Sequence, residues 1–286
     1  MNTRKNLLCT LRIRKDVRLP LSTSDHPQAQ SRLTMQQNNT LAIAKIKISL
    51  KNKIMYCPPR WAILLNPFFT IRRGLYKSLK YFAPHLTGHL LDFGAGRAPY
   101  RSLFANTSGY TTVDVEESGH PKGVKVADYY YDGKTLPFKD GAFDSILASE
   151  VFEHVFNLDE ILQELNRVLA EGGKMLVTVP FVWDEHEAPY DFARYSTFGL
   201  ADLLERNGFE VVRHCKTTSY LETVAQMLAA YLVQRKIIYN NSVLRIIATI
   251  VLAFPINAMG HLLAAVLPKD DRFYHNNVFL VRKKGA

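Results

Sequence analysis

Glycines and acids in the middle of this chain have the types and spacing needed to bind a nucleoside. The apolar residues Leu90 and Leu91 lead through Asp92 into the turn Gly94-Ala95-Gly96. This pattern is typical of a buried parallel strand whose loop lets a ligand touch the backbone, because glycine accepts positive φ and carries no side chain. A second β-rich run ends in Asp114, 22 positions after Asp92. A carboxylate at that position can accept both hydrogen bonds of a ribose diol.

The glycine loop departs from two phosphate-binding patterns. A dinucleotide fingerprint needs a third glycine, but Arg97 and Ala98 are followed here by Pro99. A Walker loop needs Gly-Lys-Ser/Thr, which does not follow either. The position of Asp114 alone fits NAD and S-adenosylmethionine equally well, and Pro99 disfavours an NAD-dependent oxidoreductase.

Two later motifs favour S-adenosylmethionine over NAD. Asp132-Gly133 stands shortly before Leu136-Pro137-Phe138, and Phe143-Asp144 opens a further apolar run. With them the chain resembles the class I S-adenosylmethionine-dependent methyltransferases of the type 11 group, roughly over residues 62–216 and a last strand near 278–282. The resemblance implies an α/β fold. We expect a Rossmann-like seven-stranded sheet, parallel with an antiparallel last strand, flanked by helices and with an apolar helical insert before that strand.

The resemblance also implies S-adenosylmethionine as the cofactor and assigns its site. The residues expected to contact the cofactor, in chain order, are Asp92, Gly94, Ala95, Gly96, Asp114, Asp132, Gly133 and Glu150. The first four would line the methionine and sulfonium end, and Asp114 would bind the ribose. Asp132 and Gly133 would face the adenine, and Glu150 would close the rim. The alternatives are a strand-end cap for Asp114 and a plain turn residue for Asp132.

Methyl transfer from a sulfonium depends largely on holding the acceptor in line with the methyl group. A base is needed only when the acceptor is a hydroxyl or a protonated amine. His186 and His154, which follow the fifth and fourth expected strands, are the catalytic candidates. Tyr190 and Arg194 are expected to form the acceptor-pocket wall, although Arg194 could equally pair with Asp191.

A metal is not expected at this site, because the resemblance extends to relatives that carry the same tract without a metal. The alternative is an oxygen-and-nitrogen metal site formed by Glu150, Glu153, His154 and His186. The competing explanation for Glu153 and His154 is packing and capping.

The positive charge of the chain lies outside the catalytic region. Among the first sixty residues twelve are Lys or Arg and two are acidic, whereas the remainder has 24 of each. A nucleic-acid enzyme usually carries a basic surface beside its site, so no nucleic-acid partner is expected. We expect a small-molecule or lipid-linked acceptor, such as a quinone or glycan precursor, methylated at oxygen or carbon. An RNA or protein methyltransferase and a non-catalytic cofactor-binding protein are the alternatives.

The composition divides the chain into two parts. Residues 1–60 are basic and polar, and we expect a disordered extension. Residues 61–286 form the predicted methyltransferase domain, with a hydrophobic helical insert over 217–275. Within the domain, helices are expected over 71–82 and after Asn157, the latter with Glu160 as its capping-box partner. No signal peptide is apparent and the three cysteines are dispersed, so we expect a cytoplasmic, reducing location.

The insert carries the strongest apolar signal in the chain. One apolar helix is expected over 221–233, and a second over 243–267, which is about long enough to span a bilayer and is broken by Pro255. The strands on either side should pair in one sheet, which excludes a single membrane span. Three interpretations stay open: a lid over the acceptor, a homodimer surface, and a hairpin lying in a membrane interface. The last would make the protein peripheral at the membrane.

Overall fold

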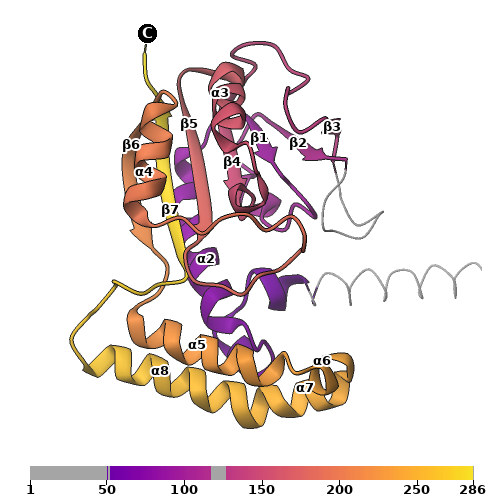
Figure 1. Cartoon of the computed structure of the whole chain (residues 1–286), viewed down its shortest axis with the longest axis vertical. Coiled ribbons are helices and arrows are strands. Elements are labelled where there is room, and N and C mark those ends of the chain that lie inside the picture. The colour runs from indigo at the N-terminus through magenta and orange to yellow at the C-terminus, as the bar shows by residue number, and fades with distance from the viewer. Residues whose placement is uncertain (1–49, 51, 117–126, 286) are drawn as a thin grey trace, which may run out of the picture. The chain divides into compact units, whose positions relative to one another are not determined.

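The computed structural model describes residues 50, 52–116 and 127–285. Its centre is one seven-stranded sheet in the order β3-β2-β1-β4-β5-β7-β6 (Figure 1). The strands are β1 His89–Phe93, β2 Gly109–Val115, β3 Tyr129–Tyr131, β4 Phe143–Ser149, β5 Leu169–Pro180, β6 Phe209–Lys216 and β7 Asn276–Lys283. The first five are parallel where they pair, and β7 runs antiparallel between β5 and β6. The predicted fold class is confirmed.

Helices cover both faces of this sheet because successive strand residues point to opposite sides. Leu91 and Phe93 pack on one face with helices α3 and α4, whereas Leu90 packs on the other with α2. The helices are α2 Phe69–Phe82, α3 Leu158–Val168, α4 Thr197–Arg206, α5 Tyr220–Val233, α6 Lys236–Asn240, α7 Ser242–Ala248 and α8 Phe254–Val266. The sheet is therefore packed between two buried apolar clusters, one on each face.

The chain after β1 differs from the usual Rossmann arrangement. Only a 3₁₀ turn, Arg101–Phe104, forms there. Ala98 has a φ of +46°, and Pro99 follows it. A left-handed residue interrupts helical backbone, so the chain cannot continue from the loop into a helix. Ala98 therefore occupies a tight turn and does not begin a helix.

Helix α3 begins after Asn157 as predicted, but its capping box is absent. The Asn157 side chain makes no hydrogen bond to the first-turn amides. Its Nδ2 instead donates to Oε2 of Glu160 at 2.8 Å and to the carbonyl of Gly133 at 3.2 Å. Asn157 thus ties the helix start to the turn after β3.

Between β6 and β7 the apolar insert forms two packed helical segments. Figure 1 shows α5 and α8 side by side, and they contact each other along their length. The second segment runs unbroken from Ser242 to Val266, with a π-helical stretch, Thr249–Ala253, between α7 and α8. The predicted break at Pro255 is therefore wrong. The wider π turn accommodates the residue that cannot donate a backbone hydrogen bond.

The structured part of the chain begins before the predicted boundary. Tyr56 packs edge-on against Tyr100 and lies under the guanidinium of Arg72. The side-chain amide of Asn66 donates to the carbonyl of Ile54 at 3.0 Å. Residues 52–60, expected to belong to the extension, therefore pack against the domain. The rest of the predicted extension, residues 1–49 and 51, lies outside the described residues.

Candidate functional site

The Gly94 loop lies where the strand order of the sheet reverses, between β1 and β4. The amide of Gly94 donates to the carbonyl of Val113 at 2.9 Å. Asp114 is 6 % exposed, and its Oδ2 accepts a 2.9 Å hydrogen bond from the amide of Gly96. Its Oδ1 accepts from the amide of Val115 at 2.8 Å. The loop and the second-strand acid, far apart in sequence, therefore form one unit at the edge where α/β sheets bind ligands.

Two cavities flank this loop. The larger, here called the Asp114 cavity, has a volume of about 290 Å³. The smaller, the Trp183 cavity, has a volume of about 210 Å³. Both are lined by Gly94, Glu150, His154 and Glu187. A ligand longer than either cavity can therefore cross the loop from one to the other.

The predicted cofactor residues are distributed unequally around these cavities. Gly94 and Glu150 border both, Ala95 and Gly96 line the Trp183 cavity, and Asp114 and Gly133 line the Asp114 cavity. Asp132 is not among the lining residues. Its Oδ1 accepts hydrogen bonds from the amides of Lys134 and Thr135, each at 2.9 Å. These contacts match the alternative role given above for Asp132, that of a plain turn residue, and not a contact with the adenine.

Asp92 lies beneath the loop and does not line either cavity. It is 5 % exposed, and the hydroxyl of Tyr110 donates to its Oδ2 at 2.5 Å. Burial raises the pKa of Asp92 to about 7, and the nearby charge of Asp114 adds to this effect. The hydrogen bond from Tyr110 acts in the opposite direction without cancelling it.

This pKa predicts a measurable pH dependence of stability. The folded pKa of Asp92 lies above the unfolded value near 4, so the native state holds the extra proton between pH 4 and 7. Stability from this group is therefore present below pH 4 and lost as pH rises to 7. Asp92→Asn removes the titration while keeping an acceptor for Tyr110. The free energy of unfolding of the variant minus that of the native chain should increase by about 1.4 kcal/mol per pH unit between pH 4 and 7, to a total of about 4 kcal/mol. Denaturant unfolding from pH 4.5 to 8 measures this difference, and a constant difference contradicts the assignment.

Glu150 follows β4 and adopts a backbone conformation that favours glycine. Its φ is +54°. The carboxylate accepts hydrogen bonds from the hydroxyl of Thr178 at 2.8 Å and from the amide of Asn276 at 2.6 Å. Burial raises the pKa of Glu150, and these two hydrogen bonds oppose the rise. Non-glycine residues in this conformation persist only where the surrounding contacts fix them.

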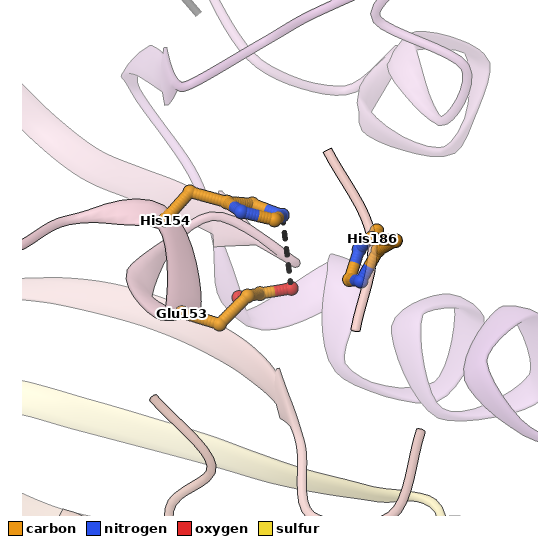
Figure 2. A group of neighbouring side chains, drawn as sticks. All are labelled: Glu153, His154 and His186. Atoms are coloured by element: carbon orange, nitrogen blue, oxygen red, sulfur yellow. Dashed lines mark ion pairs between the residues drawn. The ribbon is translucent and has the colours of Figure 1, made fainter. Parts of the chain in front are cut away.

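Glu153, His154 and His186 form a compact cluster (Figure 2). The two histidines line the Trp183 cavity, whereas Glu153 is buried. Glu153 and His154 come from the 3₁₀ turn Phe152–His154, and His186 comes from the loop after β5. The two imidazole rings lie edge to face with centroids 4.8 Å apart. Burial and the proximity of His154 lower the pKa of His186, so its ring is neutral at pH 7. The structure thus brings together the two predicted catalytic histidines.

The loop that carries His186 is held by an internal ion pair. Nη1 and Nη2 of Arg194 donate to the two carboxylate oxygens of Asp191 at 2.5 and 2.7 Å. This pair holds the pKa of Asp191 at about 2. Tyr190 lines the Asp114 cavity, whereas Arg194 lines neither cavity. Arg194 therefore forms the ion pair with Asp191 that was its alternative role, and it does not line the acceptor pocket.

Several residues at the site escaped the sequence analysis. Trp183 and Arg72 line the Trp183 cavity, and Tyr131 lines the other. Asn276 reaches Glu150 from β7, 126 positions away in sequence. An asparagine at the start of an apolar strand was the available signal for this contact, since buried amides need partners.

Comparison with known proteins gives a family match over the centre of the chain. A family model described as a methyltransferase domain matches residues 70–214. An uncharacterised protein of Methanocaldococcus jannaschii is 31 % identical over 125 residues, which are 42 % of this chain and 59 % of that protein. A ubiquinone/menaquinone biosynthesis C-methyltransferase of Burkholderia mallei is 30 % identical over 117 residues, 36 % of this chain and 48 % of the enzyme. The chain spans about half the length of these curated relatives.

Solved structures with similar folds include two methyltransferases. One is phosphoethanolamine N-methyltransferase 2 of Haemonchus contortus in complex with S-adenosyl-L-methionine. It has a TM-score of 0.44 at 17 % identity, covering 73 % of this chain and 52 % of that one. The other, an S-adenosylmethionine-dependent methyltransferase of Mesorhizobium loti, has a TM-score of 0.45 at 13 % identity, covering 73 % and 98 %.

Proposed function

The chain belongs to the class I S-adenosylmethionine-dependent methyltransferases, and from this premise we propose that it methylates an apolar or lipid-linked acceptor at a membrane surface. The site of methylation is an oxygen or a carbon atom. The observation that carries the proposal is a long, exposed apolar helix that packs on α5, which in turn packs on α2, the helix that lines the Trp183 cavity.

The residues around the two cavities fit the cofactor. Asp114 supplies a buried carboxylate for the ribose hydroxyls, and Tyr131 supplies an aromatic wall for the adenine beside it. A Cβ on Gly133 would meet nothing within 4 Å, so this turn leaves open space at the cavity. The methionine end would lie across Gly94 towards the Trp183 cavity. When bound, the cofactor supplies an electrophilic methyl group.

The protein contributes alignment and a proton acceptor. The glycine loop, held by Asp114, fixes the position from which the methyl group is presented. The acceptor would occupy the Trp183 cavity, which His154 and His186 line. His186, kept neutral by burial, can accept the proton of an acceptor hydroxyl. A carbon acceptor, like that named for the Burkholderia relative, would use the same proton acceptor.

The insert presents an unusual amount of apolar surface. Among the described residues one helix, Ser242–Val266, is apolar and long enough to cross a membrane, with 28 % of its most apolar stretch buried. Val251, Leu262 and Val266 are 61 %, 57 % and 68 % exposed. Both ends of the insert are fixed in neighbouring strands, β6 and β7. A hairpin lying in the membrane interface accommodates this surface with both ends on one side.

The insert is coupled to the acceptor cavity through α2. The side-chain amide of Gln226 in α5 accepts from the backbone of Thr70 at 3.0 Å and donates to the carbonyl of Pro67 at 2.8 Å. His261 in α8 lies 3.2 Å from the hydroxyl of Thr70. Ile71, next to Thr70 in α2, lines the Trp183 cavity, and so does Leu75, five residues after Thr70. An acceptor held in the bilayer surface would therefore reach the site past α2.

A vesicle experiment tests the membrane contact. The full chain should float with phosphatidylcholine vesicles, whereas the triple variant Val251→Gln, Leu262→Gln, Val266→Gln should bind at least about tenfold more weakly, because it loses apolar contact with the lipid. The matched control, Phe198→Gln with Val212→Gln, changes exposed apolar side chains outside the insert, 86 % and 46 % exposed, and should float like the native chain.

Two further outcomes separate the alternatives. Light scattering that shows the triple variant changing from dimer to monomer, with vesicle binding unaltered, would assign the insert to a dimer surface. In a second assay, methyl-labelled cofactor is incubated with the protein and a cell extract. The label should enter the organic-soluble fraction, and label confined to RNA or protein would overturn the proposed acceptor class.

A further inference from the structure

We propose that Glu153, His154 and His186 form a binding site for a divalent transition metal, with Zn²⁺ as the probe ion. The three side chains offer one ligand atom each, and these atoms lie within 4.8 Å of one another. One carboxylate and two imidazoles are a donor set that binds Zn²⁺, Fe²⁺ and related ions. Figure 2 shows Glu153 and His154 on one side of the cluster and His186 facing them from the separate loop.

Glu153 carries the strongest evidence. It is 1 % exposed, and neither carboxylate oxygen has a hydrogen-bond partner among the residues that the structure describes. The closest basic atom is Nε2 of His154, 3.8 Å from Oε1. An ionised carboxylate buried without a partner is costly, so such a group either takes up a proton or is compensated by a paired charge or a metal ion. The carboxylate is aimed into the histidine cluster, where a cation would satisfy it.

Both histidines are oriented as metal ligands. Nδ1 of His154 lies 2.7 Å from the carbonyl oxygen of Tyr190. Nδ1 of His186 lies 3.2 Å from Oδ2 of Asp191, which also accepts from the backbone amide of His186 at 2.9 Å. In each ring the acceptor next to Nδ1 favours a proton there, which leaves the Nε2 lone pair for a metal. Metal-binding histidines are commonly held in this way by a carbonyl or a carboxylate.

The spacing needs a small closure. Ligand atoms of a tetrahedral Zn²⁺ lie about 3.4 Å apart, given bonds of about 2.1 Å. Oε1 of Glu153 and Nε2 of His154 are 3.8 Å apart, close to this value, and the three ligand atoms lie within 4.8 Å of one another. Binding therefore needs an approach of at most about 1.4 Å. The loop that carries His186 is tied to the turn that carries Glu153, because the amide of Phe192 donates to the backbone carbonyl of Glu153 at 2.8 Å.

Three protein ligands leave a coordination position open. His154 and His186 line the Trp183 cavity, so this position faces the acceptor. Resting on the proposed function, we infer that the metal binds an acceptor oxygen and favours its deprotonated form. In the metal-loaded protein the imidazoles would hold the ion, and the proton of the acceptor would be released to solvent as the acceptor binds. His186 would act as the proton acceptor only in the metal-free protein.

Metal binding to the full chain, stripped with a chelator, provides the test. Titration calorimetry with ZnCl₂ should show one site that is lost in His186→Ala and weakened at least about 100-fold in Glu153→Gln. Co²⁺ should give visible absorption bands of a four- or five-coordinate ion, absent in both variants. His214→Ala, which removes a half-buried histidine bonded to Asn277, is the matched control and should bind as the native chain does.

The melting temperature gives a second readout that a structural role would not reproduce. Glu153→Gln keeps the shape of the side chain but cannot ionise, so the metal-free variant should melt no lower than the native chain, while the increase caused by Zn²⁺ should disappear. Unchanged Zn²⁺ affinity in Glu153→Gln and His186→Ala would overturn the metal site. Because these measurements use neither cofactor nor vesicles, their failure would leave the proposed methyltransferase function untouched.

Discussion

Gly94→Ala is expected to reduce the affinity for S-adenosylmethionine by at least about 100-fold. Gly94 has a φ of +66°, and a Cβ there would lie 2.2 Å from Cγ2 and 2.8 Å from Cβ of Val151. The left-handed backbone costs about 1–2 kcal/mol for alanine, and the overlap forces the loop or Val151 to move. Either movement disturbs the wall that both cavities share. Titration calorimetry with the cofactor measures the loss.

The matched control is Gly172→Ala. Gly172 has a φ of +69°, but a Cβ there meets nothing within 4 Å. The two substitutions therefore impose the same backbone strain and differ in the steric overlap. Native affinity is expected for Gly172→Ala, and Val151→Ala should partly restore binding to the Gly94 variant. Equal affinity in both single variants would show that the loop does not contact the cofactor.

Asp114→Ala is expected to weaken cofactor binding by about 1–3 kcal/mol, or roughly 5- to 150-fold. The variant loses a buried carboxylate that lines the cavity and also orders the amide of Gly96. Asp114→Asn keeps an oxygen for Gly96 but loses the charge, so an intermediate loss is expected. The same calorimetric titration measures both variants.

Asp132→Ala distinguishes Asp132 from Asp114, two of the four acids that the sequence placed at the cofactor. Asp132 is bonded to the amides of its own turn, so its removal should change the affinity by less than about twofold. A larger effect for Asp132→Ala than for Asp114→Ala would reverse this assignment. In that case the adenine would lie over the turn at Asp132.

The fold was predictable because its signals are local and repeated. Most strands carry an apolar run, and the Gly94 and Glu150 loops follow such runs at the same edge of the sheet. β3, three tyrosines of which only Tyr131 is buried, is the exception. Asp114 and Gly94 could therefore be placed together from their positions at strand ends. The helices of the insert were equally clear, because their apolar residues are contiguous.

The details of the site depend on contacts that spacing does not reveal. The hydrogen bond from Asn276 to Glu150 requires β7 to lie between β5 and β6. The solvation of Glu153 also depends on its three-dimensional surroundings, since the same residue on an exposed turn would be hydrated. The sequence showed a carboxylate beside a histidine, and the structure shows that the carboxylate is buried.

The position of β7 has a consequence for biosynthesis. β6 and β5 are both paired with β7, yet the whole apolar insert is translated before β7. The ribosome therefore releases these helices while β6 still lacks its neighbour, and non-local pairing of this kind is slow. A nascent chain at this stage exposes both an unpaired strand and an apolar helical hairpin, and chaperones bind such surfaces. Early capture of the hairpin by lipid would protect it until the sheet closes.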